Sequence, residues 1–273
     1  AANRRAIASD ARYVAASGTG SIYQMYIAHN HQFLWAAAMM EGRSAEAREA
    51  ARNTVAAAPV EMLREMPGFD ILLTYPVLTS LRFGQWQAVL DEPSPPKDFP
   101  YANAMWHYAR GAAFASTGRL EEAVSEKREL ERLSREIPAD AKESLNSARE
   151  LLRIAARALS GRIAFRGGRL DEAVRELATA AAAEDRLSYA EPPDWHAPVR
   201  QTLGAVLLAS RRAAQAEAVY REDLRRNPAN GWSLYGLFRS LETQGKTRAA
   251  AAEKKRFEEA WSHADIVLTA SDF

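Results

Sequence analysis

The hexapeptide GRLEEA at residues 118–123 returns as GRLDEA at 168–173 and as GRSAEA at 42–47. Weaker copies are GQWQAV at 84–89, RRAAQA at 211–216 and GKTRAA at 245–250. Each copy lies between two stretches with the apolar spacing of a helix. A left-handed glycine ends the first helix, an acidic residue opens the second, and the alanine allows close packing. The phrase therefore predicts an all-α chain of antiparallel helix pairs.

Further positions extend this pattern beyond the turn. Gly204, Ala216, Tyr220 and Pro228 follow one another at fixed offsets, and the steps from residue 84 to 118 and from 211 to 245 are 34 residues. In these features the chain resembles the tetratricopeptide-repeat (TPR) family, whose unit has 34 residues. The resemblance implies a right-handed superhelical solenoid of about six helix pairs plus a partial N-terminal helix. The first helices of the pairs would line a concave groove.

We expect a single TPR-like solenoid domain over residues 1–273, with a remnant of a truncated repeat and a loop at 1–20. Residues 264–273 are expected to form a capping tail, which a terminal repeat requires. Three insertions interrupt the repeats, at 91–100, 137–148 and 184–195. The first carries four prolines and cannot be helical, and the second is expected to extend its flanking helices. The insertions either line the binding face or fill gaps between repeats, and both readings stay open.

Composition excludes several classes of protein. The 36 basic and 35 acidic residues leave a net charge of +1, so no whole-chain field attracts nucleic acid. The chain has no cysteine for disulfides or thiolate metal sites. No apolar run approaches the roughly 20 residues of a membrane-spanning helix. We therefore expect a soluble protein without membrane insertion, cytoplasmic or, if a signal segment was removed, periplasmic.

The resemblance also implies which side chains face the groove. His29, Gln32 and Met39 lie at groove positions of one first helix, and Tyr108 and Gln201 lie at those of two others. Trp195 precedes the helix that carries Gln201. His29, Asn30 and Phe33 also resemble the start of a bacterial subgroup of the family, with Gln32 where its second histidine stands. The candidate ligand-binding set comprises His29, Gln32, Met39, Tyr108, Trp195 and Gln201.

The family resemblance implies a non-catalytic binding scaffold without a cofactor, which holds a peptide, a protein segment or a small ligand in its groove. Protein or peptide partners are expected first, nucleic acid is not, and an enzyme is disfavoured because no nucleophile elbow, phosphate loop or zinc motif is present. The alternative is an enzyme or metal-binding protein that uses His29, His31, His107 and His196. His29 and His31 point to opposite sides of one helix. Convergence of the histidines would favour this alternative.

Overall fold

The computed structural model describes residues 2–18 and 20–272. Ala1 and Thr19 of the expected N-terminal remnant, and Phe273 of the expected tail, lie outside the described residues. The prediction of an all-α chain is confirmed, and neighbouring helices pack in sequence order. None of the helices in this part of the chain combines the length and apolar character that crossing a bilayer requires.

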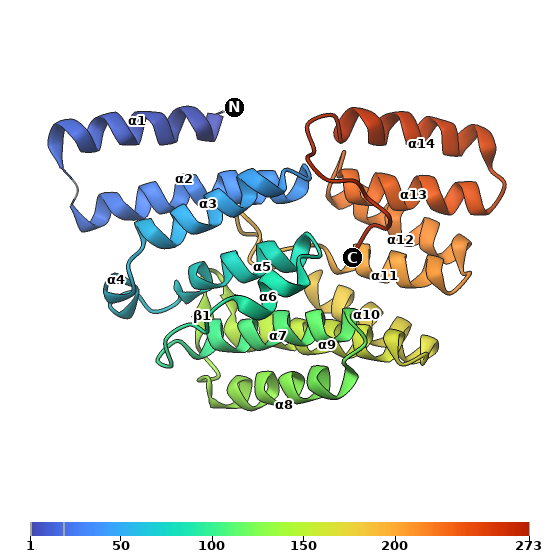
Figure 1. Ribbon diagram of the computed structural model, residues 1–273, viewed down its shortest axis with the longest axis horizontal. Helices are drawn as coiled ribbons and strands as arrows, with labels where there is room; N and C mark the ends of the chain where they lie inside the picture. The colour runs from blue at the N-terminus through green and yellow to red at the C-terminus, as the bar shows by residue number, and fades with distance from the viewer. Residues whose placement is uncertain (1, 19, 273) are drawn as a thin grey trace.

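Helix pairs follow a first helix, α1 (Ala2–Ser17), that packs on α2 (Figure 1). The pairs are α2 (Ser21–Met40) with α3 (Ser44–Ala57), α5 (Tyr75–Arg82) with α6 (Trp86–Asp91), α7 (Pro100–Ser116) with α8 (Leu120–Glu136), α9 (Ala148–Arg166) with α10 (Leu170–Glu184), α11 (Val199–Ala209) with α12 (Ala213–Arg226), and α13 (Gly231–Thr243) with α14 (Thr247–Ala260). A short helix, α4 (Val60–Arg64), and a 3-10 turn, η1 (Asp70–Thr74), connect α3 to α5.

The repeated phrase forms the tight turn inside each pair. Gly118 has a φ of +82°, and the amide of the next residue, Arg119, donates to the Phe114 carbonyl at 2.9 Å. This arrangement satisfies a carbonyl at the end of the first helix. The turns at 42, 84, 168, 211 and 245 also have positive φ. Ala123, which closes the phrase, has no exposed surface because the paired helices meet at its methyl group.

The turn at Arg211 is the one of the six that lacks glycine. Its φ of +60° costs a side-chain-bearing residue about 1 kcal/mol, so Arg211→Gly is expected to raise the free energy of unfolding by about that amount. Gly118→Ala is the reverse experiment. An added Cβ at Gly118 meets no atom within 4 Å, so only the backbone strain of the positive φ changes the stability. This substitution is expected to lower the free energy of unfolding by about 1 kcal/mol. Urea unfolding measures both changes in the free energy of unfolding. A lower value for Arg211→Gly than for the wild type would contradict the expected effect of backbone strain.

Close packing extends from one helix pair to the next. The ring of Tyr220, on α12, lies between Gly204 of α11 and Gly236 of α13. A Cβ atom at Gly204 or Gly236 would come within 2.3 Å or 2.1 Å of that ring. The two glycines therefore admit the aromatic side chain that joins three successive helices.

The insertions differ from one another in structure. Residues 92–99 are non-helical, as their prolines predict. The expectation that residues 137–148 extend the flanking helices is wrong. The chain forms a hairpin there, β1 (Lys142–Glu143) paired antiparallel with β2 (Asn146–Ser147). Ile137 ends α8 in an extended conformation, and Pro138, the next residue, has no amide proton to continue a helix.

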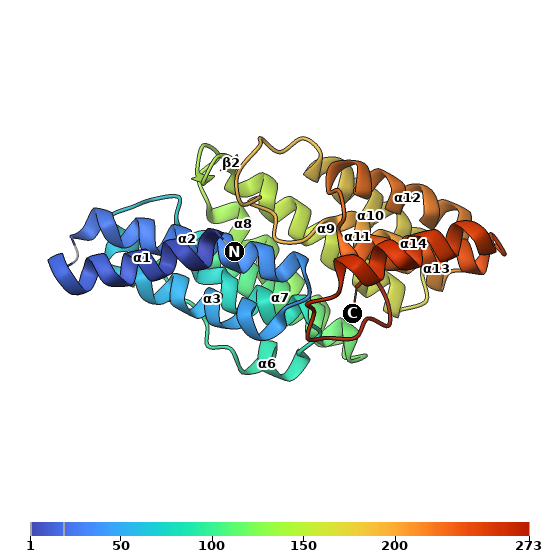
Figure 2. The ribbon, with the colours of Figure 1, turned by 90° about the horizontal axis from the view of Figure 1, so that it is seen from above.

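The last helix pair and the segment after it lie against the first full pair (Figures 1 and 2). The indole of Trp232 on α13 donates to the Met39 carbonyl on α2 at 3.1 Å. The carboxylate of Asp265 accepts the amides of Ser44 and Ala45 at the start of α3, at 2.7 and 2.9 Å. Residues 264–272 then run back past α13 and end between α5 and α11. The tail is thus exposed at Asp265 and Val267 and becomes buried at Leu268 and Ser271.

Candidate functional site

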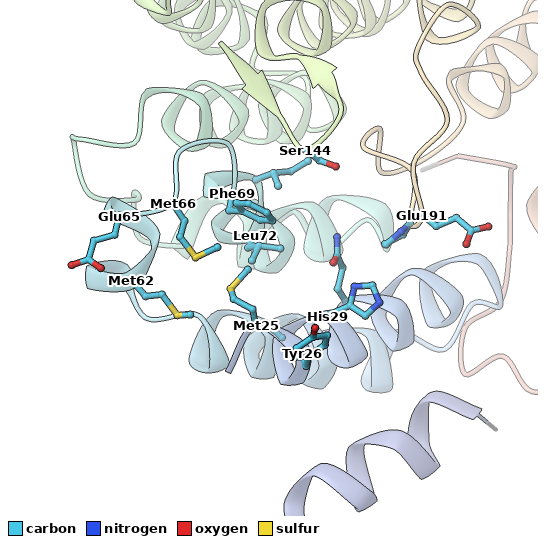
Figure 3. Close-up of a pocket in the computed structure, with 14 residues that line it drawn as sticks. Met25, Tyr26, His29, Met62, Glu65, Met66, Phe69, Leu72, Ser144 and Glu191 are labelled. Carbon is cyan, nitrogen blue, oxygen red and sulfur yellow. The ribbon is translucent and has the colours of Figure 1, made fainter. Parts of the chain in front are cut away.

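An apolar cavity of about 550 Å³ opens between α2, the connection from α4 to η1, and two insertion loops (Figure 3). We call it the methionine pocket. Its lining residues are Met25, Tyr26, Ala28, His29, Gln32, Met62, Glu65, Met66, Phe69, Ile71, Leu72, Ser144, Glu191 and Pro192. The volume lies within the range of roughly 300–1,000 Å³ that is usual for small-molecule sites.

The helices α2 and α4 supply the apolar walls. Met25, His29 and Gln32 follow one another at the four- and three-residue spacing of one helix face, so α2 presents them together to the pocket. Met62 and Met66 show the same four-residue spacing in and just after α4, on the opposite wall. Methionine side chains are flexible and polarizable, so they adapt to irregular apolar shapes. The pocket is therefore suited to an apolar group.

The hairpin holds the wall that carries Phe69. Gly68 has a φ of +92°, and an added Cβ would come within 2.9 Å of the Lys142 carbonyl oxygen. The Ser144 amide donates to the Gly68 carbonyl at 2.9 Å. These contacts place Phe69 at the pocket, where 37% of its surface remains exposed. The loop thus keeps a large apolar ring accessible to a ligand.

A buried carboxyl pair fastens the hairpin to η1. The Glu143 side chain accepts the Ile71 amide at 3.0 Å and shares a hydrogen bond with Asp70. Burial raises the pKa of Glu143 to about 11, and the hydrogen bond and negative charge of Asp70 add to the effect. Glu143 is therefore protonated at neutral pH and can donate its carboxyl proton to Asp70.

Asn146 ties the same hairpin to the third insertion. Its side-chain amide group donates to Asp194 at 2.7 Å and to the Ser188 carbonyl at 3.1 Å. Its side-chain oxygen accepts the Ser188 amide at 2.7 Å. These bonds fix the loop from which Glu191 and Pro192 reach the pocket. Two insertions, at 137–148 and 184–195, therefore contribute to the lining.

The polar groups of the pocket are few. The side-chain amide of Gln32 donates to the Tyr75 hydroxyl at 2.7 Å, which fixes its orientation. His29 is exposed, and its ring centre lies 4.4 Å from that of Phe33. Glu65 and Glu191 place carboxylates at the two ends of the cavity in Figure 3. The lining contains carboxylates but no lysine or arginine.

The structure divides the six candidate ligand-binding residues among three places. His29 and Gln32 line the methionine pocket. Met39 is buried, and its carbonyl accepts the indole N–H of Trp232. The other three lie in the interior cluster described next. The lining residues outside α2 were not among the predicted candidates, although the four-residue spacing of Met62 and Met66 was a usable signal.

The interior cluster lies where α5, α7, α9 and α11 meet. Its members are Arg82, Tyr108, Arg162, Trp195, His196, Gln201 and Asp272. The Arg82 guanidinium donates to the Gln201 side-chain oxygen at 2.6 Å and lies 3.6 Å from the Trp232 ring centre. Arg162 forms an ion pair with Asp272 at 2.6 Å. The cavity here, about 20 Å³, has room for about one water molecule.

The histidines have separate partners. His107 pairs with Glu126 at 2.5 Å, whereas His196 packs against Tyr108 and Trp195. Burial, together with Arg82 and Arg162, lowers the pKa of His196 to about 3. Burial also lowers the pKa of His31. Among the described residues, no three histidine, aspartate or glutamate side chains gather in an arrangement that would hold a metal ion.

Comparison with known proteins identified no relative of this chain. No protein-family model matches this chain, and neither does any curated protein.

Proposed function

We propose that this protein is a non-catalytic binding protein that takes an apolar group into the methionine pocket. The observation that carries the proposal is the cavity of about 550 Å³, lined by three methionines, Phe69 and Leu72. Its size favours a small ligand over a long protein segment. Burial of apolar ligand surface supplies the binding energy, at about 25 cal/mol per Å² before the costs of association.

The polar side chains of the pocket support binding and not catalysis. Gln32 is neutral and already bonded to Tyr75, and His29 contacts a phenyl ring. A general base needs a partner that orients it and a nucleophile within hydrogen-bond reach. Among the lining residues that the structure describes, no serine–histidine or histidine–carboxylate hydrogen bond is formed. The polar groups are thus suited to orienting a ligand.

We further infer that the helix pairs form a right-handed superhelix of the tetratricopeptide type. Support comes from the six left-handed turn positions and from the packing of successive helices. In this reading α2 is the first helix of a repeat, and its groove face is the wall of the pocket that carries His29 and Gln32. The insertions at 137–148 and 184–195 narrow the groove into a pocket.

Titration with Nile red, an uncharged apolar dye, tests the proposed function. The expected result is a saturable rise in fluorescence with one dye per chain. Met66→Arg places a charged side chain in the pocket and is expected to weaken dye binding at least tenfold. Val267→Arg is the matched control, because Val267 is 85% exposed and lies outside the pocket. Unsaturable fluorescence, or equal effects of the two variants, would refute the proposal.

A further inference from the structure

We propose that the ligand of the methionine pocket is a hydrophobic organic cation, that is, an apolar group that bears an ammonium or similar positive charge. This inference rests on the proposed function and adds the charge of the ligand to it. It follows from the signs of the charges around the cavity and from the aromatic rings exposed there.

The ionisable groups that line the pocket are predominantly acidic. Glu65 follows α4 at one end, and Glu191 lies in the third insertion at the other (Figure 3). Both side chains are exposed, so each carboxylate can turn toward a bound charge without losing a buried partner. Glu191 accepts a hydrogen bond from the Tyr189 hydroxyl. A cation with an apolar body would meet a carboxylate whichever way it entered.

The basic side chain at the end of α4 is paired with a carboxylate outside the methionine pocket. Arg64, at the end of α4, donates from Nε to the Asp98 carboxylate at 2.6 Å. The hydrogen bond with Asp98 raises the pKa of Arg64, so this arginine stays charged and paired. Asp98 and Arg64 line a neighbouring cavity and not the methionine pocket. The two carboxylates of the pocket therefore keep their negative potential.

The neighbouring cavity has charged residues of both signs. It shares Met66, Phe69 and Ser144 with the methionine pocket and is also lined by Arg64, Asp70, Asp98, Asp140, Lys142 and Glu143. The preference for a cation therefore rests on the two carboxylates that line the methionine pocket itself.

Two aromatic residues of the lining are accessible to a positive charge. Tyr26 on α2 is 61% exposed, and Phe69 on the opposite wall is 37% exposed. Ring faces attract ammonium groups, and the attraction increases as water is removed. The methionine side chains surround the apolar body of the ligand. A neutral apolar molecule would use only part of this lining, and an anionic one would be repelled by both carboxylates.

Three probes with the same octyl chain test the charge preference: octyltrimethylammonium, 1-octanol and octanoate, each as displacement of bound Nile red. The cation is expected to bind at least tenfold tighter than 1-octanol, and octanoate weakest. The gap between cation and alcohol is expected to shrink in 0.5 M NaCl, because salt screens exposed charges.

The double substitution Glu65→Gln and Glu191→Gln locates the effect. It is expected to weaken binding of the cation about tenfold and leave that of 1-octanol unchanged. Glu61→Gln is the matched control, because Glu61 lies one turn earlier on α4, is 82% exposed and does not line the pocket. Equal binding of the three probes, or an unchanged cation affinity in the double variant, would overturn the charge inference while the apolar pocket stands. Failure of Nile red and all three probes to bind would instead overturn the proposed function.

Discussion

Asp272→Asn is expected to lower the free energy of unfolding by about 4 kcal/mol, because it removes the carboxylate from a buried ion pair. Arg162 and Asp272 have side chains that are only 12% and 11% exposed, and their closest atoms are 2.6 Å apart. Burial alone lowers the pKa of Arg162, but the charge of Asp272 and its hydrogen bond reverse that effect. The charge of Arg162 in the interior therefore depends on Asp272.

A second buried guanidinium increases the loss of stability that we expect for Asp272→Asn. Arg82 lies in the same cluster, and burial lowers its pKa to about 10, although Asp272 and Asp223 counteract this. Without Asp272, the two cations would repel each other in an environment of low polarity. Hydrogen exchange of residues 264–272 is expected to accelerate, since Ser271, whose hydroxyl contacts Tyr220 and donates to the Gln201 carbonyl, would lose its neighbouring anchor.

The control lies in the same segment. Asp265 is exposed and caps α3, so Asp265→Asn is expected to cost only about 1 kcal/mol. Chemical denaturation of the two variants, with Arg162→Met and the double variant Arg162→Met/Asp272→Asn, completes a double-mutant cycle. The free energy of unfolding that the double variant loses is expected to be smaller than the sum of the losses of the two single variants. A loss below 1 kcal/mol for Asp272→Asn would show that the pair does not hold the segment in place.

The sequence predicted the local features of the fold well. The turn phrase depends on contacts within about six residues, such as the Arg119 amide with the Phe114 carbonyl, and its glycine and alanine report those contacts directly. The same phrase located Arg211, where a non-glycine residue adopts the glycine conformation. Helix pairs and their order could therefore be derived from residue spacing alone.

The pocket could be predicted only in part. The tetratricopeptide frame predicted that His29 and Gln32 face a groove, and the structure places both in the lining of the pocket. Phe69, Ser144 and Glu191 belong to connections outside the repeat frame, and their positions depend on contacts such as Glu143 with Ile71, 72 residues apart. Such pairings leave no periodic signal in the sequence. The interior position of Trp195 and Gln201 likewise depends on the segment 264–272, which covers them from a distant part of the chain.

The stability of the wild-type protein is expected to fall as pH rises from 5.5 to 8.5, by up to about 4 kcal/mol through Glu143 alone. The pKa of this buried carboxyl group is raised to about 11 in the folded protein, mainly by burial and further by Asp70. The unfolded chain loses the proton near pH 4.5. Between these values the folded state binds one more proton than the unfolded state, so each pH unit costs about 1.4 kcal/mol.

Glu143→Gln removes this titration and keeps the hydrogen bonds. The glutamine side-chain oxygen is expected to accept the Ile71 amide, and its amide group to donate to Asp70 in place of the Glu143 carboxyl proton. The free energy of unfolding of the variant, relative to that of the wild type, is therefore expected to increase steadily from pH 5.5 to 8.5. The other acidic groups that face Glu143 from neighbouring elements, Asp194, Tyr75 and Tyr101, are present in both proteins, so the difference isolates Glu143.

Urea unfolding at three pH values measures the difference, with Glu121→Gln, on the exposed face of α8, as the control whose difference stays constant. A pH-independent difference for Glu143→Gln would show that Glu143 is ionised in the folded protein. In that case a buried negative charge on Glu143 would lie beside Asp70 at the wall of the pocket. The hairpin would then be held against η1 by the Ser144–Gly68 bond and Asn146, and the wall that carries Phe69 would be expected to loosen at every pH tested.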